Sequence, residues 1–219
     1  MGRIITVKGV GDVSAKPDYI TLSMSIQTVS RKYDAAMDEA ARRIEALRSA
    51  AERAGLEKDD LKTAYFHIDT HSETVSDKKG NYRQTFAGYE CVYRLKLSFD
   101  FDSALLVRVL SAFSECGAAP ELNIAFTVKN PDAVREELLT ATAENARAKA
   151  ETLCRASGAK LGQLVRIDYN WAGLEIASRT SFRVEDGIQP LMAASSAAPE
   201  ITPEDIRLHD TAVFEWEIE

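Results

Sequence analysis

The sequence predicts an α+β fold: a long-stranded antiparallel sheet with three amphipathic helices packed on one face. Five segments alternate apolar and polar residues with a period of two, as strands with one solvated face do. Three other segments repeat apolar residues at spacings of three and four, as helices lying on a sheet do. The predicted order of elements is β-β-α-β-β-α-β-α-β-β.

Two long segments, residues 16–29 and 86–99, show the strand pattern most clearly. In the first, the apolar side consists of Ile20, Leu22, Met24 and Ile26. Such alternation favours antiparallel pairing with one solvated face over a parallel sheet covered on both faces. The apolar positions of the other three strands are Ala64, Phe66, Ile68, Leu122, Ile124, Phe126, Val128, Ala212, Phe214, Trp216 and Ile218.

The three helices are predicted from their apolar stripes and their end signals. The first is expected to bury Tyr33, Met37, Ala40, Ile44, Leu47, Ala51 and Ala54. The second begins near Asp102 and should bury Leu105, Leu106, Val109, Leu110 and Phe113. The third begins at Asn130-Pro131 and should bury Leu139, Ala143, Ala146, Ala150 and Leu153. Each helix is expected to end at a glycine, which closes a helix in the left-handed conformation: Gly55, Gly117 and Gly158.

One domain is expected over residues 1–219. Its middle, from the strand at residue 16 to the strand ending at 128, has the β-α-β-β-α-β order of a ferredoxin-like split. The polar stretch around residues 77–81 is a turn signal, and it predicts a projecting hairpin over residues 71–88. Residues 171–203 are rich in small residues and proline, and are expected to form a mobile excursion before the last strand.

Charge and composition argue against several partners. The net charge is −7 and the isoelectric point is near 5.2, which disfavours nucleic-acid binding and a polybasic membrane patch. Membrane insertion is not expected, because no apolar run approaches the ~18 residues of a spanning helix. Arg3 leads straight into the strand-like residues 4–7, so the chain as given is expected to be cytoplasmic; the alternative is an exported form whose leader was removed. Three widely spaced cysteines fit reduced thiols: Cys91, Cys116 and Cys154.

Four motifs, in order, resemble those of the SIMPL-domain family, a bacterial domain of unknown function related to periplasmic immunogenic proteins. The first is Ile-Thr-Val-Lys-Gly-Val-Gly at residues 5–11, followed by Ala-Lys-Pro-Asp at 15–18. The second is Leu-Lys-Thr at residues 61–63, and the third is the alanine-rich helix and its exit at 143–162. The fourth is Ile-Thr-Pro-Glu-Asp-Ile at residues 201–206. Together they span nearly the whole chain.

The resemblance implies a non-enzymatic α+β domain with no catalytic or cofactor-binding residues to carry over. It also implies self-assembly, a link to stress tolerance and, for exported members, a place in the bacterial envelope. Because this chain shows no leader, the envelope location is left as the alternative.

Three groups of residues partly match known patterns: a dinucleotide loop, a metal site and a catalytic dyad. Gly9-Val10-Gly11 lacks the third glycine and the following helix of a dinucleotide loop, so turning of the backbone before Pro17 is the preferred interpretation. His67, Asp69 and His71 share a strand face, but the two histidines are about 13 Å apart along a strand, so no metal site is expected. His209-Asp210 has no serine or cysteine partner in sequence. No enzyme activity, cofactor or metal is therefore predicted, and a hydrolase is the least favoured function.

Exposed aromatic residues supply the leading candidates for an interaction surface. Tyr82 and Phe86 are apolar rings within the polar hairpin, and Val75 lies nearby. Such residues anchor protein contacts, so we predict a homo-oligomer that uses hairpin 71–88 and an uncovered strand edge. The alternative function is a small-molecule or peptide binding module, with Trp171 and Phe182 of the 171–203 segment as candidate ligand contacts.

Overall fold

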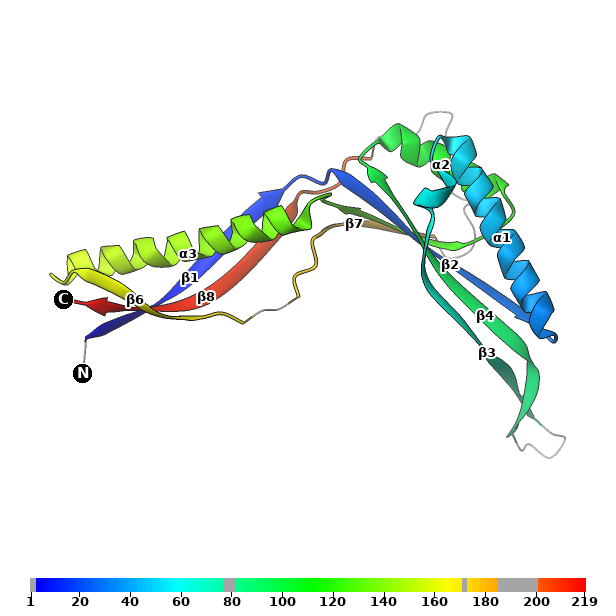
Figure 1. Ribbon diagram of the computed structural model, residues 1–219, viewed down its shortest axis with the longest axis horizontal. Helices are drawn as coiled ribbons and strands as arrows, with labels where there is room; N and C mark the ends of the chain where they lie inside the picture. Colours follow the sequence, from blue (N-terminus) through cyan, green and yellow to red (C-terminus); the bar gives the residue numbers. More distant parts are fainter. Residues whose placement is uncertain (1–2, 77–81, 171–172, 185–200) are drawn as a thin grey trace. The chain divides into compact units, whose positions relative to one another are not determined.

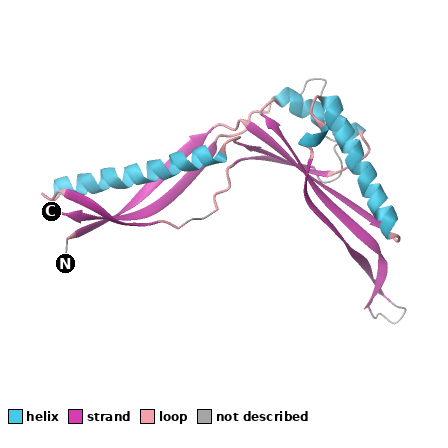
Figure 2. Ribbon diagram, in the orientation of Figure 1, coloured by secondary structure: helices cyan, strands magenta, loops and turns pink. Residues whose placement is uncertain are grey.

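The computed structural model of the chain describes residues 3–76, 82–170, 173–184 and 201–219 (Figure 1). These residues form helices and strands in two antiparallel sheets, and the predicted α+β class is confirmed (Figure 2). The helical elements are α1 (Tyr33–Ala54), the short 3-10 helix η1 (Lys58–Asp60), α2 (Ser103–Glu115) and α3 (Pro131–Ala156). The strands are β1 (Ile4–Ala15), β2 (Tyr19–Ser30), β3 (Lys62–Ser76), β4 (Tyr82–Asp100), β5 (Glu121–Thr127), β6 (Leu161–Asp168), β7 (Ala177–Val184) and β8 (Ile206–Ile218).

The strands divide between two sheets, where the sequence predicted one. The first has the strand order β1-β8-β6 and the second the order β3-β4-β2-β5-β7. The chain correspondingly forms two compact units, a subdivision that the strand pattern did not indicate. Unit 1 consists of residues 1–18, 127–179 and 203–219, and unit 2 of residues 19–126 and 180–202.

Unit 2 contains the predicted ferredoxin-like split, which its strand order confirms. Helix α1 connects β2 and β3, and β4 lies between these two strands. Helix α2 connects β4 and β5, and β2 lies between them. The pairs β2–β4 and β3–β4 are antiparallel. Because each helical connection spans one intervening strand, both helices return to the same face of the sheet (Figure 1).

Apolar and polar side chains alternate along β2 and β4, and the apolar ones form the core of unit 2 with α1 and α2. Ile20, Leu22, Met24 and Ile26 are at most 2% exposed, which confirms the predicted apolar side of β2. The start of α2 is fixed by Asp102, whose Oδ1 accepts hydrogen bonds from the amides of Ala104 at 2.8 Å and Leu105 at 3.0 Å. The predicted glycine stops are also confirmed, with Gly55 in the left-handed region at φ 102°.

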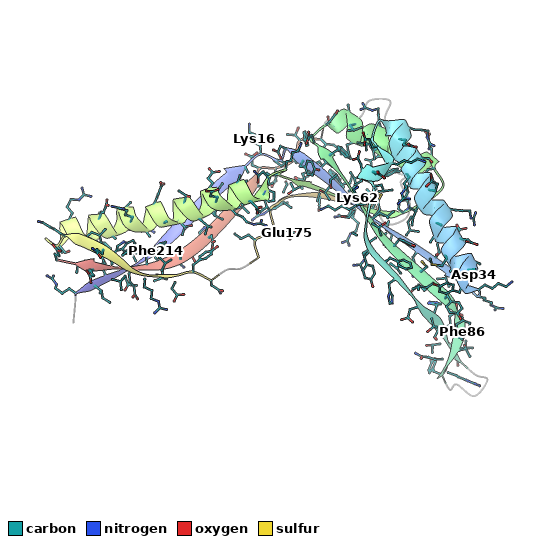
Figure 3. The ribbon with its side chains drawn as sticks, in the orientation of Figure 1. Lys16, Asp34, Lys62, Phe86, Glu175 and Phe214 are labelled. Atoms are coloured by element: carbon teal, nitrogen blue, oxygen red, sulfur yellow. The ribbon has the colours of Figure 1, made fainter. Side chains whose placement is uncertain are left out.

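Unit 1 packs α3 against the sheet β1-β8-β6. β1 and β8 pair antiparallel from Ile4 opposite Glu217 to Ala15 opposite Ile206. The stacked rings of Phe214 and Trp216, with centroids 5.5 Å apart, lie in the core beneath the helix (Figure 3). A second cluster includes Val13 of β1 and Leu138 of α3.

The buried face of α3 differs from the predicted stripe. Ala146 and Ala150 are buried as expected, but Leu138, Thr142 and Cys154 are buried in place of Leu139, Ala143 and Leu153. The hydroxyl of Thr142 donates to the carbonyl of Leu138 at 2.8 Å, so this polar residue is satisfied within its own helix. The buried face therefore repeats every four residues, whereas the predicted stripe alternated spacings of four and three.

β7 is an element that the sequence did not predict. It lies within segment 171–203, as the last strand of the five-stranded sheet. Ile176, just before it, is 6% exposed, and Ser178 is 8% exposed with its hydroxyl donating to the carbonyl of Glu204 at 2.7 Å. Part of the proline-rich segment thus takes part in the fold.

Candidate functional site

The three candidate self-association residues lie on the β3–β4 hairpin, which extends past the first turn of α1 (Figure 1). Tyr82 is 80% exposed, Phe86 58% and Val75 50%. The register pairs Tyr82 with Ser76 and Phe86 with Ser72. Since side chains alternate along a strand, Tyr82 and Phe86 share one face of the hairpin and Val75 lies on the other. The structure therefore places two of the three candidates on one face, about 13 Å apart along the strand.

Phe86 and Tyr82 differ in how well the rest of unit 2 supports them. The ring of Phe86 lies edge-on to that of Tyr89, with centroids 5.4 Å apart, and Tyr89 lies edge-on to Tyr33 of α1 at 5.7 Å. These ring contacts hold Phe86, which is labelled on the hairpin in Figure 3, against the rest of unit 2. Tyr82 stands at the end of β4 with most of its surface in water. Phe86 is therefore held by neighbouring rings, whereas Tyr82 projects into solvent.

The edge strands of the two sheets are not equally open. β1, an edge of the three-stranded sheet, has its backbone capped by α3: the Val10 amide donates to Asn145 Oδ1 at 3.0 Å, and Lys149 Nζ donates to the Lys8 carbonyl at 3.2 Å. These contacts occupy backbone groups at Lys8 and Val10 that a further strand would need. β3 is an edge of the five-stranded sheet and carries the exposed rings of Tyr65 and Phe66.

A bulge divides β3 and sets the angle of the hairpin. The register shifts between His71 and Ser72, and Gly88 lies opposite His71. A Cβ on Gly88 would come 2.5 Å from the carbonyl oxygen of Ser30, so only glycine lets the neighbouring strand approach this closely. The bulge separates two stretches of edge, Tyr65 to His71 and Ser72 to Ser76.

The structure describes one of the two candidate ligand contacts, Phe182, and not the other. Trp171 lies outside the described residues. Phe182 of β7 is 38% exposed, and its ring packs edge-on against the buried Phe126 with centroids 6.3 Å apart. This contact explains Phe182 as a border residue of the core, and its role in ligand binding stays a prediction.

Each histidine of β3 lies near a carboxylate. His67 Nε2 is 3.7 Å from Asp69 Oδ2, and His71 Nδ1 is 3.8 Å from Glu90 Oε1. The amide of Thr70, which donates to the Asp69 carboxylate, holds the pKa of that group below its ordinary value. Within the described ranges, no three His, Cys, Asp or Glu side chains come together in a way that could hold a metal ion.

His209 and Asp210 do not form a dyad. His209 Nδ1 is 2.8 Å from Asp12 Oδ1 on β1, whereas Asp210 Oδ2 accepts the phenol proton of Tyr169 at 2.7 Å. The adjacent residues point to opposite faces of β8, as strand geometry requires. Both contacts are cross-strand links within unit 1.

Gly9 and Gly11 lie within β1, so the predicted turn before Pro17 is not their role. A Cβ at Gly9 would come 2.3 Å from the Thr142 carbonyl oxygen. The glycines instead let α3 pack closely on the strand, and no helix follows them as a dinucleotide site would need.

The cysteines do not cluster. Cys91 is fully buried against Ala36 and Ala40, and Cys154 is 2% exposed. Burial raises the pKa of the Cys91 thiol, which keeps it protonated and unreactive.

The described residues also form a concavity that the sequence did not predict, on the face of the five-stranded sheet away from α1 and α2. It has a volume of about 650 Å³, and its lining includes Ser23, Ser25, Arg94, Lys96, Asn123 and Arg183. We call it the open-face concavity. The outward positions of β2 and β4 could be assigned from alternation alone, but the pairing that gathers their charges could not.

Comparison with known proteins finds one family. The SIMPL model, described as "Protein of unknown function (DUF541)", matches residues 5–216. The 26 kDa periplasmic immunogenic proteins of Brucella melitensis and Brucella abortus are each 28% identical over 163 residues, which cover 74% of this chain and 65% of the relative. The chain thus spans just under two thirds of the length of these curated relatives.

One solved structure aligns with most of the chain, but the likeness is slight. The regulatory subunit of aspartate kinase from Thermus flavus aligns with 97% of this chain and 90% of its own at 9% identity, with a TM-score of 0.17, a likeness too slight to bear on the fold. No helix among the described residues has the length and apolar character needed to cross a membrane.

Proposed function

Because this chain belongs to the SIMPL family, we propose that it is a non-enzymatic protein of the bacterial envelope that assembles with copies of itself. The function of the family is unknown, and the proposal of self-assembly rests on the surface of this chain. The observation that carries self-assembly is the pair Tyr82 and Phe86, exposed on one face of a hairpin next to the open edge of β3.

The hairpin supplies both parts of a strand-addition contact. Backbone groups along the open edge of β3 provide hydrogen bonds, and the two rings provide apolar surface to bury. Aromatic residues are enriched in protein interfaces for this reason. The side-chain contacts from α3 at Lys8 and Val10 of β1 favour β3 over β1 as the place of contact.

The envelope location is supported by the two relatives, both named as periplasmic proteins. The cytoplasmic location expected from the sequence finds no support in these comparisons. Two of the three cysteines are buried, which would protect their thiols in an oxidising compartment. Fractionation of the source bacterium, with detection by antibody, should place the native protein in the periplasmic extract; recovery in the cytoplasmic fraction would contradict this part of the proposal.

Assembly is tested by light scattering coupled to size-exclusion chromatography over a range of concentrations. The wild-type protein should have a mass that is a multiple of its 24.1 kDa and rises with concentration. The double variant Tyr82→Ser, Phe86→Ser should shift to the monomer, because it removes the apolar contact and leaves the core of unit 2 intact.

Val165→Ser is a matched control for that experiment. Val165 is 54% exposed on β6, so the change removes exposed apolar surface from unit 1 and leaves the hairpin unaltered. Its assembly should equal that of the wild type. A wild-type chain that stays monomeric at every concentration, or a Val165→Ser variant that alone dissociates, would refute assembly through the hairpin.

A role in stress tolerance is proposed from the family resemblance. Deletion of the gene should lower survival in peroxide, and the hairpin double variant should fail to restore it if assembly is required. Full restoration by that variant would separate the stress role from assembly.

A further inference from the structure

The open-face concavity lies on the side of the five-stranded sheet opposite α1 and α2. Two cross-strand rows contribute Ser23, Ser25, Arg94 and Lys96 to its lining. In the first row, Lys96 of β4 lies opposite Lys62 of β3 on one side and Ser23 of β2 on the other. In the second row, Arg94 lies opposite Tyr65 and Ser25. Each row thus presents basic and hydroxyl side chains to solvent on one face.

The charges in these rows are unbalanced. Lys62 and Lys96 are paired directly across the strands, an arrangement that like-charge repulsion makes unfavourable. Among the residues that the structure describes, neither lysine nor Arg94 has a carboxylate within 4.0 Å, and Glu121 is the acidic residue in the described lining. A local excess of positive charge on a chain of net charge −7 is not explained by the packing of unit 2.

Arg94 is held in place without a counter-ion. Its guanidinium carbon lies 5.2 Å from the centroid of the Tyr65 ring, a cation–π contact that orients the group and leaves its N–H donors available. Guanidinium donors in a fixed fork match the oxygens of carboxylates and phosphates. Ser23 and Ser25 add hydroxyl donors from the neighbouring strand.

We propose that the open-face concavity binds a small anionic ligand with two or more acidic oxygens, held by Arg94 and Lys96 with Ser23 and Ser25 as further donors. The volume of about 650 Å³ falls within the range of small-molecule sites. The chemistry is shared by polycarboxylates and phosphate compounds. This site lies on the face of the sheet, whereas the proposed assembly contact uses the edge of β3 and the exposed rings of the hairpin.

Isothermal titration calorimetry on the full chain tests the site, with citrate and pyrophosphate as separate probes at constant ionic strength set by sodium chloride. We expect saturable binding of at least one probe with one site per chain. Tighter binding of citrate would identify a carboxylate ligand, and tighter binding of pyrophosphate a phosphate ligand. No saturable heat with either probe would overturn the proposal.

Three variants locate the binding. Arg94→Gln and Lys96→Gln should each weaken it about tenfold, the loss expected for one charge-assisted hydrogen bond. Arg53→Gln makes the same change of charge on an exposed position of α1, and it should bind as the wild type does. Equal affinity of all three variants would overturn the assignment, since the binding would then be nonspecific.

Thermal unfolding without ligand gives an independent readout. If the basic row exists to bind an anion, Lys96→Gln should leave the unfolding midpoint unchanged or raise it, because the substitution relieves the repulsion from Lys62. A clear fall in the midpoint would show that Lys96 serves the fold, and would count against the proposal.

Discussion

Gly11 of β1 and Thr142 of α3 are in such close contact that a Cβ on the glycine would lie 2.2 Å from the threonine Oγ1. The same added atom would lie 2.6 Å from the backbone oxygen of Leu138, which cannot move independently of the helix. The close approach of strand and helix in unit 1 therefore depends on the absence of a side chain at residue 11.

Gly11→Ala should destabilise the protein by about 1–3 kcal/mol, the usual cost of overpacking a core. The lower entropy of the unfolded alanine chain offsets only about 0.4–1 kcal/mol of this. Urea unfolding followed by circular dichroism measures the change. Gly173→Ala is the control, because a Cβ there meets nothing within 4 Å. Equal midpoints for the two variants would contradict the packing argument.

Asp102→Ala should destabilise unit 2 by about 1 kcal/mol, because it removes the acceptor for two amides at the start of α2. Asp102→Asn retains a side-chain oxygen at the same place and should recover most of the loss. Urea midpoints of the three proteins give the comparison. If the asparagine variant were as unstable as the alanine variant, the negative charge and not the hydrogen bonds would be the source of stability.

The elements that the sequence predicts well are those whose signals are local. β2 and the three helix stops depend on alternation within one strand and on single glycines, and both features were found where expected. The division into two sheets depends on pairing between distant segments, such as Ile4 with Glu217. Alternation shows that a strand has a wet face, but it does not select the neighbouring strand.

α3 shows how a local signal can point to the wrong residues. An alanine-rich helix offers several similar stripes, and the pattern counts Thr142 as polar. The contact with Gly11 makes room for this threonine, and its hydroxyl bonds within the helix, so it is buried. The apolar pattern therefore predicts the middle of the buried face, Ala146 and Ala150, but not Thr142, because the glycine contact is a tertiary feature.

The two candidate surfaces also differ in whether the sequence alone could reveal them. Tyr82 and Phe86 could be selected from the sequence because aromatic residues stand out in a polar hairpin. The basic row of the open-face concavity could not, since Lys62 and Lys96 lie 34 positions apart and meet only through the β3–β4 register.

The three cysteines should differ in their reactivity with iodoacetamide. Cys116 is half-buried and should be alkylated in the native protein, whereas Cys91 and Cys154 are buried and should react only on unfolding. The raised pKa of Cys91 further lowers its thiolate fraction at neutral pH. Mass spectrometry of digested samples, with and without urea, reports the order. Native alkylation of Cys91 at the rate of Cys116 would show that its strand opens readily.

The link between Tyr169 and Asp210 should make stability depend on alkaline pH. The hydrogen bond to the Asp210 carboxylate, together with burial, raises the pKa of the Tyr169 phenol above its ordinary value of about 10. The folded protein thus holds this proton more tightly than the unfolded chain. The resulting stabilisation is fully present below the unfolded pKa and is lost as the pH rises through the folded pKa.

Tyr169→Phe removes this hydrogen bond and retains the ring. At pH 8 the variant should be less stable than the wild type by about 1 kcal/mol, the typical net contribution of one hydrogen bond. The difference should shrink at a pH above the folded pKa, because the wild-type phenol is then ionised beside a carboxylate and can no longer donate. Urea unfolding of both proteins from pH 8 upward measures the difference, and a gap that stayed constant across this range would show that the ionisation of Tyr169 is not linked to folding.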